Sequence, residues 1–570
     1  SVDPKYYYEP TEIRGTATDD TNNNEVWVAI TSGPGYSTYW NNTTKSWGGS
    51  FWNPVNFWQE DGGGGNNDLW KLTDVSTECW TNHVQYNIKC YGRGPAGDET
   101  PAEGNYLIID RTKPESEVKY PADGDHFKGL TLVKITGTSW DISPGKVGGV
   151  NIQIQKGSEW YNGSSWGSEY WIDKATASDG AFNSQAETWE WTVSYPTECW
   201  KDEGTYVIKS RAYDKTLAVA NTEDAPYYSV SIVIDNTPPT SGLLFPNKPI
   251  HNSLPIISGT AADTPTGIGQ WKDIRLQMKN LDTGLSWTGT SWTGETEVEI
   301  SSASLNGAGF TFYPDSWTYT GVGSDWTSGY KYRIRNKAVD RATNEQTTPG
   351  ELTFIYDATP PKSEITQPLV GDRLNSLSWI SGTADDYPPT GKPWATGVST
   401  TSLDMSPYDG VLIALKGETT GFFLGGTNWG GTEHKWFTTV DYSTTTKEWR
   451  KSTGVLGTFI SAGNPADGTY YIIPRAIDNA RNFEVSYNTR TFVWDTTRPT
   501  SFTTSPSTGS YVQTITQITG TANDATAGPK EIKINFSYTS GVDYYWTGSS
   551  WTTNVYDLVF STSGVTGTIT

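Results

Sequence analysis

The sequence predicts an all-β fold in which β-sandwiches follow one another along the chain. Three observations support this prediction: a short strand ending in Gly-Thr recurs five times, a proline-containing junction recurs about every 125 residues, and helix formers are scarce. An aspartate follows each Gly-Thr pair within four residues, and the glycines are Gly15, Gly137, Gly259, Gly382 and Gly520. Repetition at this length is typical of beads on a string, each with its own core.

The junctions divide the chain into four nearly complete repeats and one partial repeat. Each has the pattern Asp-x-Thr-x-Pro, and their aspartates, Asp110, Asp235, Asp357 and Asp495, stand 125, 122 and 138 residues apart. Proline stiffens the chain there and cannot continue a sheet ladder. The predicted boundaries define repeat 1 (1–111), repeat 2 (112–236), repeat 3 (237–358), repeat 4 (359–496) and repeat 5 (497–570).

Within a repeat, the predicted strands come in a constant order. The junction leads to the Gly-Thr strand, as at residues 132–135, and then to a tryptophan-flanked hairpin, as at residues 160–166, whose Gly and Asn suit a tight reversal. A tyrosine-rich strand ending in aspartate comes late, as at residues 206–214, and a final strand, residues 228–234, leads into the next junction. Short strands separated by turn signals, with no helical period, predict a Greek-key sandwich.

Composition narrows the classes of protein to consider. Hydrophobic residues are 35% of the chain and aromatic residues 13%, with 27 Trp against 2 Met, so the cores should be small and aromatic. A formal charge of −22 argues against a nucleic-acid partner, which requires clustered Lys and Arg. No stretch approaches the ~18 to 20 apolar residues of a membrane span. Because the chain begins Ser1-Val2-Asp3-Pro4, without Met or an export signal, we expect a processed or partial piece of a longer precursor.

Three cysteines cannot form a disulfide framework, and their odd number leaves at least one unpaired. Cys79 and Cys199 share the run Thr-Glu-Cys-Trp, so we predict that they are buried at equivalent places in two repeats. Cys90 is close enough in sequence to Cys79 that a bridge between them stays open.

These motifs resemble the bacterial immunoglobulin-like repeats of large secreted and surface proteins. The resemblance rests on the Asp-x-Thr-Pro-Pro junctions, on Gly-Thr-Ala-x-Asp at 259–263, 382–386 and 520–524, and on Arg-Ala-x-Asp at 211–214 and 475–478. It covers nearly the whole chain and implies tandem immunoglobulin-like sandwiches located outside the cell or on its surface. Such domains serve as stalks, adhesin shafts, lattice subunits and accessory modules of enzymes, so the resemblance implies no single activity.

The first and last repeats depart from this pattern. Only 14 residues precede Gly15, against about 25 between junction aspartate and glycine in later repeats, so repeat 1 lacks an opening strand. Repeat 5 has the tryptophan hairpin but no tyrosine-rich or closing strand. Either the chain is a window on a longer array, or another copy supplies strands and the subunits polymerise.

Acidic residues gather where successive repeats should meet. Sandwich topology brings the junction aspartate close to the ends of the Gly-Thr strand and of the tyrosine-rich strand in the next repeat. Several carboxylates beside carbonyl groups suit the ~6 to 8 oxygen ligands of Ca²⁺. The alternative is that these side chains only cap turns. The candidate ligands are Asp110, Asp141, Asp214, Asp235, Asp263, Asp340, Asn344, Asp357, Asp385, Asp386, Asp478, Asn482, Asp495 and Asp524.

Tryptophan and asparagine suggest two further kinds of site. Aromatic faces stack on sugars, and the least regular tryptophans are in repeat 1, although recurrence with the core pattern favours packing. The candidate glycan contacts are Trp40, Trp47, Trp52 and Trp58. Asn-x-Ser/Thr motifs that could carry glycans occur at Asn41, Asn42, Asn162 and Asn535.

Catalytic patterns are missing from the sequence. The four histidines lie in different repeats, and there is no metal-spaced pair, Gly-x-Ser-x-Gly elbow or phosphate loop. We therefore predict a non-enzymatic extracellular or cell-surface structural protein: a stalk, surface layer or filament subunit that positions something at a distance or assembles with copies of itself. The alternative is an adhesin that binds carbohydrate or a host surface through exposed tryptophan.

Overall fold

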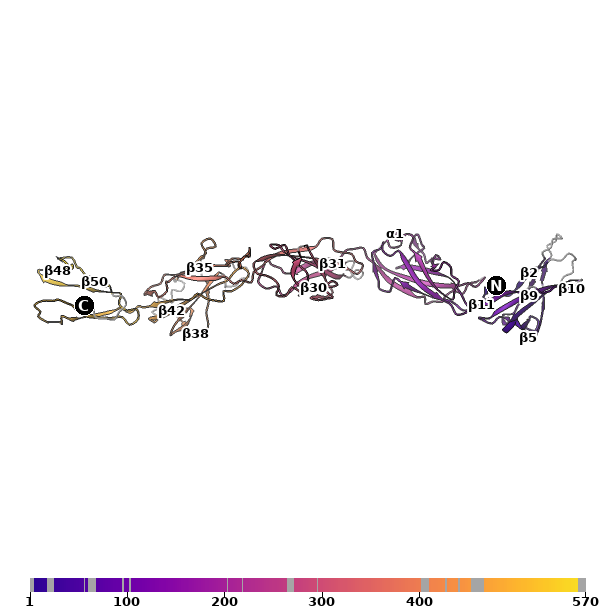
Figure 1. Ribbon diagram of the computed structural model, residues 1–570, viewed down its shortest axis with the longest axis horizontal. Helices are drawn as coiled ribbons and strands as arrows, with labels where there is room; N and C mark the ends of the chain where they lie inside the picture. The colour runs from indigo at the N-terminus through magenta and orange to yellow at the C-terminus, as the bar shows by residue number, and fades with distance from the viewer. Residues whose placement is uncertain are drawn as a thin grey trace. The chain divides into compact units, whose positions relative to one another are not determined.

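A computed structural model describes residues 5–17, 25–55, 57–59, 68–94, 97–101, 104–201, 203–217, 219–263, 271–294, 296–400, 410–425, 428–438, 441–452 and 466–561. Almost all regular structure is β (Figure 1). Contacts divide the chain into two compact units: Ser1–Ser241 with Ala261–Ile274 and Lys337–Thr348, and Gly242–Thr260 with Arg275–Asn336 and Pro349–Thr570.

Repeat 2 is a sandwich of two sheets that shows the pattern most fully. One sheet has the order β12-β14-β19-β18, and the other β13-β21-β20-β15-β16-β17. All pairings are antiparallel except that of β13 with β21, which is parallel. The elements are β12 (Glu115–Tyr120), β13 (His126–Phe127), β14 (Lys134–Trp140), β15 (Val147–Lys156), β16 (Glu159–Tyr161), β17 (Trp166–Gly167), β18 (Thr176–Ala177), β19 (Ala186–Thr192), α1 (Pro196–Cys199), β20 (Gly204–Asp214) and β21 (Ser229–Ile234).

Repeat 3 has the same two-sheet plan. Its sheets have the orders β22-β24-β30-β29 and β23-β32-β31-β25-β26-β27, with β28 paired to β25. The strands are β22 (Thr240–Phe245), β23 (Ile250–His251), β24 (Ile257–Ala262), β25 (Trp271–Asn280), β26 (Ser286–Trp287), β27 (Trp292–Gly294), β28 (Glu299–Ser301), β29 (Phe310–Phe312), β30 (Ser316–Tyr319), β31 (Tyr330–Asp340) and β32 (Gly350–Tyr356).

Repeat 4 also repeats this plan. Its sheets have the orders β33-β35-β41-β40 and β34-β43-β42-β36-β37-β38, with β39 paired to β36. The strands are β33 (Lys362–Gln367), β34 (Arg373–Leu374), β35 (Trp379–Asp385), β36 (Val411–Gly417), β37 (Gly421–Gly425), β38 (Asn428–Gly431), β39 (Phe437–Thr438), β40 (Asp441–Tyr442), β41 (Glu448–Ser452), β42 (Gly468–Ala476) and β43 (Arg490–Trp494).

Repeat 1 contains a large sheet like those of the other repeats, but its second sheet has only three described strands. The large sheet has the order β1-β11-β9-β3-β4-β5, with β10 paired to β9 and β6 paired to β3. The second sheet has the order β2-β8-β7, and no described strand pairs with the outer edge of β2. Its elements are β1 (Lys5–Tyr7), β2 (Ile13–Ala17), β3 (Glu25–Ser32), the 3-10 turn η1 (Pro34–Tyr36), β4 (Thr38–Asn41), β5 (Ser46–Gly48), β6 (Asn53–Pro54), β7 (Phe57–Gln59), β8 (Asp68–Leu72), the 3-10 turn η2 (Thr77–Cys79), β9 (Gln85–Gly94), β10 (Gly97–Asp98) and β11 (Asn105–Ile109).

Repeat 5 forms three small sheets and buries none of its described hydrophobic side chains. The sheets have the orders β44-β45, β46-β50 and β47-β48-β49. The strands are β44 (Thr500–Ser505), β45 (Thr519–Asn523), β46 (Glu531–Ile534), β47 (Ser537–Ser540), β48 (Val542–Trp546), β49 (Trp551–Thr552) and β50 (Leu558–Ser561). A groove of about 560 Å³ between its strands is lined by Ile515, Thr516, Gln517, Ile518, Ile534, Phe536, Trp546, Trp551 and Phe560.

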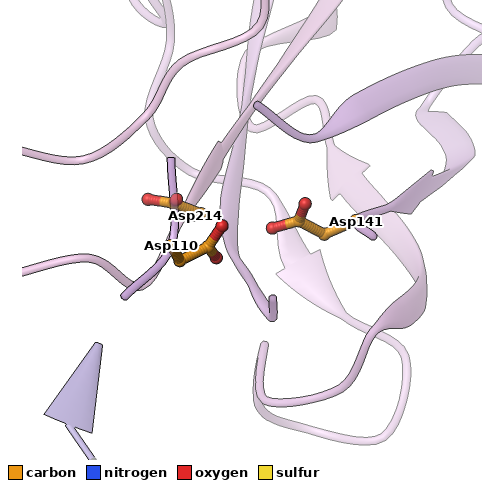
Figure 2. Close-up of side chains that lie close together, drawn as sticks. All are labelled: Asp110, Asp141 and Asp214. Atoms are coloured by element: carbon orange, nitrogen blue, oxygen red, sulfur yellow. The ribbon is translucent and has the colours of Figure 1, made fainter. Parts of the chain in front are cut away.

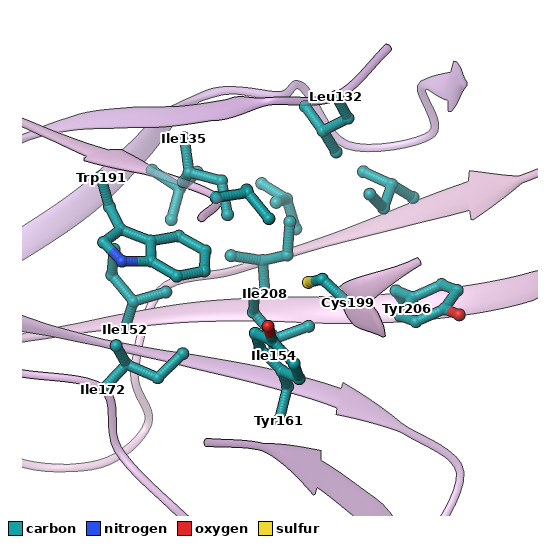
Figure 3. Close-up of a cluster of buried hydrophobic side chains, with 14 of the residues drawn as sticks. Leu132, Ile135, Ile152, Ile154, Tyr161, Ile172, Trp191, Cys199, Tyr206 and Ile208 are labelled. Atoms are coloured by element: carbon teal, nitrogen blue, oxygen red, sulfur yellow. The ribbon is translucent and has the colours of Figure 1, made fainter. Parts of the chain in front are cut away.

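The core of repeat 2 lies between its two sheets and is rich in aromatic and β-branched side chains (Figure 3). Separate cores of the same kind occur in repeats 1 and 4. Cys79 and Cys199 are both fully buried, which confirms the prediction from their shared run. All three cysteines are free, so the bridge from Cys79 to Cys90 is not formed.

The Gly-Thr motif is explained by a tryptophan that lies on its glycine. In repeat 2, a Cβ atom at Gly137 would lie 2.2 Å from Cζ2 of Trp189 and 2.2 Å from the carbonyl oxygen of Glu117. The same tryptophan contact occurs at Gly15, Gly259 and Gly382. Glycine is needed here because the ring on the neighbouring strand occupies the space of a side chain.

The chain enters and leaves each complete sandwich at opposite ends. In repeat 2, β20 ends at Asp214, close to the entry junction, and β21 runs back antiparallel until Ile234 pairs with Gly204 at the start of β20. At ~3.4 Å per residue, the 11 residues of β20 separate the two ends by about 35 Å. Tyr330 pairs with Tyr356 in repeat 3, and Gly468 with Trp494 in repeat 4, in the same way. Within each complete sandwich the chain therefore passes from one end to the other.

A buried side chain fastens the opening strand to the tyrosine-rich strand. In repeat 4, Glu484 accepts hydrogen bonds from the backbone N–H and hydroxyl of Ser363 and from the N–H of Ala476. Glu223 makes the equivalent contacts in repeat 2, and Gln346 occupies this place in repeat 3. Burial raises the pKa of both glutamates.

We expect Glu484→Gln to make repeat 4 less sensitive to pH. Because the folded-state pKa is raised, the contribution of Glu484 to stability is complete below its ordinary pKa of about 4.3 and is lost as the pH rises through the raised value. Glutamine cannot ionise, and Gln346 shows that the amide fits. Hydrogen exchange of repeat 4 peptides at pH 5 and 8 measures the effect. Gln346→Glu should introduce the dependence into repeat 3, and equal pH responses of all variants would contradict the account.

Candidate functional site at the acidic junctions

Three carboxylates converge where one repeat leads into the next. One follows the last strand of the preceding repeat, one lies at the end of the Gly-Thr strand, and one lies at the end of the tyrosine-rich strand. In each group, one oxygen from every carboxylate lies within 4.8 Å of the others. Among the described residues these groups are junction cluster 1 (Asp110, Asp141, Asp214), junction cluster 2 (Asp235, Asp263, Asp340) and junction cluster 3 (Asp357, Asp386, Asp478).

Junction cluster 1 is buried, and two of its oxygens have no donor. Asp110, Asp141 and Asp214 are exposed by 0%, 3% and 2%. Figure 2 shows the carboxylate of Asp141 pointing toward the other two from the opposite side. Oδ1 of Asp110 accepts hydrogen bonds from the N–H and hydroxyl of Thr112 at 3.1 and 2.9 Å. Oδ2 of Asp110 and Oδ2 of Asp141 are buried without a hydrogen-bond partner.

Gly145 lies directly beside these two oxygens. A Cβ atom built on Gly145 would lie 2.6 Å from Oδ2 of Asp141 and 2.7 Å from Oδ2 of Asp110. Both unpartnered oxygens therefore lie against Gly145, so close that a side chain at residue 145 would collide with them.

Junction cluster 2 has the same construction. Asp235 is fully buried, and its Oδ1 accepts a hydrogen bond from the N–H of Thr237 at 3.0 Å, whereas its Oδ2 has no partner. Asp340 accepts from the backbone N–H of Asn344 at 2.7 Å and from its Nδ2 at 2.8 Å. Asp263 is 8% exposed.

Junction cluster 3 combines one free oxygen with a similar set of bonds. Oδ2 of Asp386 accepts a hydrogen bond from the N–H of Gly397 at 2.8 Å, whereas its buried Oδ1 has no partner. Asp478 accepts from the backbone N–H of Asn482 at 2.8 Å and from its Nδ2 at 2.7 Å. Both oxygens of Asp357 accept backbone N–H groups.

One asparagine ties each cluster to the preceding repeat. Nδ2 of Asn344 donates to the carbonyl oxygen of Asp235 at 2.9 Å, and Nδ2 of Asn482 donates to that of Asp357 at 2.7 Å. Nδ2 of Asn221 makes the same bond to the carbonyl oxygen of Asp110 at 2.9 Å, although the repeat pattern of the sequence does not indicate this residue. It follows Asp214 by seven residues, whereas the other two asparagines follow their aspartates by four.

Burial raises the pKa of several of these carboxyls. The pKa of Asp141 is raised to about 7, mainly by burial and secondly by the negative charge of Asp110. The same main cause raises the pKa of Asp235 and of Asp386 to about 6, and that of Asp478 to about 7. The clusters are therefore poorly suited to holding three negative charges without a cation.

Three of the predicted aspartate ligands lie outside the clusters. Asp385 forms an ion pair with Lys447 at 3.0 Å, and its neighbour Asp386 occupies the cluster position instead. Asp495 and Asp524 both accept a hydrogen bond from the N–H of Ala527, at 3.0 and 3.1 Å. No third acidic side chain among the described residues completes a cluster with them.

The predicted glycan contacts in repeat 1 differ in their environments. Trp40 is 1% exposed and packs against Trp47 at 5.6 Å, so its ring is not available to a sugar in the folded repeat. Trp47 is partly buried against the same core. Trp52 is half-buried with its ring 4.8 Å from Tyr91 in an edge contact. Trp58 lies in β7, and its side chain is outside the part that the structure describes.

The four predicted glycosylation asparagines also vary in exposure. Asn41 and Asn42 are half-buried, and Asn42 accepts hydrogen bonds from Trp40 Nε1 and Lys45 Nζ. Asn162 is exposed at the turn between β16 and β17, and Asn535 is exposed before β47. Intact-mass measurement of native material tests whether any of them carries a glycan.

The comparisons with known proteins concern fold. No family model matches the chain, and no curated protein matches its sequence. A tetra-tandem repeat from the extending region of a large adhesion protein is similar in structure, with 16% identity, 85% of this chain and 95% of that one covered, and a TM-score of 0.27. A 1.5-MDa bacterial ice-binding adhesin matches at 12% identity, 67% and 99% coverage, and a TM-score of 0.26.

The fibronectin(III)-like modules of Clostridium thermocellum CbhA match at 15% identity, 43% and 95% coverage, and a TM-score of 0.22. These structures are tandem repeat and fibronectin-like domains, two of them from large adhesins. The paired sheets of the chain itself show a tandem array of immunoglobulin-like β-sandwiches, as the sequence predicts. Within the described residues, no helix has the length and apolar character needed to cross a membrane.

Proposed function

We propose that the protein is a non-enzymatic extracellular spacer, a stalk or surface structure that holds something at a distance. One observation carries this proposal: each complete sandwich takes in the chain at one end and releases it at the other, about 35 Å away along its longest strand. Serial addition of such repeats lengthens a molecule without requiring a new fold. The acidic surface rich in Thr, Ser, Asn and Gly suits the outside of a cell.

Electron microscopy of the full chain tests this proposal. Individual particles should be elongated, with resolvable beads in single file. Compact particles of one globule would contradict a spacer.

Self-association is a second candidate, favoured by the open groove of repeat 5. Trp551 and Phe560, which line this groove, are 46% and 40% exposed, and the outer edge of β2 in repeat 1 has no described partner strand. We propose that a second copy of this chain adds a strand at the groove of repeat 5 or at the edge of β2, and that the subunits so build a polymer. Analytical ultracentrifugation should then show concentration-dependent growth of the full chain, whereas a monomer at all concentrations would contradict it.

Glycan binding through tryptophan is the remaining candidate, and the half-buried Trp52 is its best-placed residue. A glycan array with the wild-type chain and Trp52→Ala tests it. Binding that the substitution removes supports an adhesin, and silence of the wild-type chain supports the spacer alone.

A further inference from the structure

We propose that each of the three junction clusters binds one calcium ion. The inference concerns the carboxylates alone. It could fail while the spacer proposal holds, because strand register alone places the entry and exit of the chain at opposite ends of each sandwich.

The spacing of the carboxylates fits a single ion. Calcium binds oxygen at about 2.3 to 2.6 Å, so two ligands on opposite sides of the ion lie about 4.6 to 5.2 Å apart. In every cluster the three oxygens lie within 4.8 Å of one another. One ion can therefore contact all three side chains without a change of fold.

Unpartnered oxygens provide the second and independent observation. A buried carboxylate oxygen normally accepts at least one hydrogen bond, because leaving it without a partner costs its desolvation. Cluster 1 has two such oxygens, on Asp110 and Asp141, and further ones belong to Asp235 in cluster 2 and to Asp386 in cluster 3. These four side chains are at most 6% exposed. In cluster 1 both oxygens lie close together beside Gly145.

Turn capping explains only part of each cluster. The carboxylates of Asp214, Asp340 and Asp478 accept hydrogen bonds on both oxygens from the asparagine that follows them, together with nearby N–H groups, as turn caps do. The free oxygens belong to the other members, which come from different strands. Turn capping does not require these free oxygens, whereas a cation site requires them as ligands.

Charge and ligand chemistry favour calcium. Among the described residues, no lysine or arginine forms an ion pair with a member of cluster 1 or 3. The clusters contain carboxylates without histidine or cysteine, which excludes the ligand set preferred by zinc. Magnesium requires a near-ideal octahedron and keeps several waters, whereas calcium accepts irregular sets of oxygens.

The position of these ions would couple neighbouring repeats. In cluster 1, Asp110 belongs to the last segment of repeat 1, and Asp141 and Asp214 belong to repeat 2. The two repeats are also connected by the hydrogen bond from Nδ2 of Asn221 to the carbonyl oxygen of Asp110. A bound ion would add a second link across the same junction and would stiffen it.

Equilibrium dialysis of the full chain against calcium, after chelator treatment, tests the proposal by direct metal counting. We expect three ions per chain, with saturation by about 1 mM, as in extracellular calcium modules. Asp386→Asn should bind two ions. The matched control Asp385→Asn should still bind three, because the carboxylate of Asp385 pairs with Lys447 outside the cluster. Circular dichroism confirms that each variant is folded.

A second variant keeps the test independent of Asp386. Gly145→Ala places a methyl group between the free oxygens of cluster 1 and should also reduce the count from three to two. No binding by the folded wild-type chain at several millimolar calcium would overturn the proposal, as would equal counts for Asp386→Asn and Asp385→Asn. Equal binding of magnesium under the same conditions would overturn the choice of calcium.

Discussion

Replacing Trp200 by alanine is expected to destabilise repeat 2 by about 3 to 5 kcal/mol. Trp200 is 2% exposed, packs edge-on against Tyr206 at 5.2 Å, and donates a hydrogen bond from Nε1 to the carbonyl oxygen of Leu132 at 2.8 Å. The substitution opens a cavity and leaves a buried carbonyl without its donor. Hydrogen exchange of the full chain measures the loss, because peptides of repeat 2 should exchange faster while those of repeat 4 should not.

Two variants control this experiment. Trp140→Ala removes a tryptophan that is 39% exposed and should change stability by no more than about 0.5 kcal/mol. Trp200→Phe keeps most of the volume but loses the hydrogen bond, so its effect should be intermediate. A loss for Trp140→Ala as large as that for Trp200→Ala would show that the contact is not responsible.

Replacing Gly137 by alanine is expected to cost repeat 2 about 3 kcal/mol, at the upper end for overpacked cores. The new methyl group would lie 2.2 Å from both Trp189 and the carbonyl oxygen of Glu117. Neither neighbour can yield easily, because the oxygen is backbone and Trp189 is 1% exposed in the core. The same exchange measurement detects the change as faster exchange in β12, β14 and β19.

Gly167 offers the matched glycine. A Cβ atom there would meet nothing within 4 Å, so Gly167→Ala should leave the exchange of repeat 2 nearly unchanged. If Gly137→Ala were equally silent, the explanation of the Gly-Thr motif by tryptophan packing would be wrong.

The sequence predicts the sandwich fold and the hairpins because those depend on local signals. Trp40 with Trp47, Tyr161 with Trp166 and Trp546 with Trp551 form the expected cross-strand pairs. Alternation and turn residues lie within a few positions of each other, so a single pass along the chain detects them.

Pairings between distant segments were harder to predict. The sequence marks Gly137 as recurrent, but the tryptophan that requires it lies 52 residues later in β19 and belongs to no comparable motif. The parallel pairing of the two-residue strand β13 with β21 has no local signal either. Such contacts depend on tertiary packing, which overrides short patterns.

The exact members of the acidic clusters are also difficult to predict from the sequence. Strand order indicates which aspartates share a pole, but it does not separate Asp385, the last residue of β35, from Asp386, which follows it. Asn221 was missed because a longer loop shifts it by three positions relative to Asn344 and Asn482. Alignment by motif requires constant spacing, and loops do not preserve it.

Single-molecule force spectroscopy of the full chain, pulled from its two ends, tests most directly whether the repeats are serial and separately folded. Fully extended residues span at most about 3.6 Å each, so repeats 2 and 3 should each release about 400 Å and repeat 4 about 450 Å, after subtraction of the folded length. The account predicts separate force peaks with these spacings. One cooperative rupture of the whole chain would contradict it.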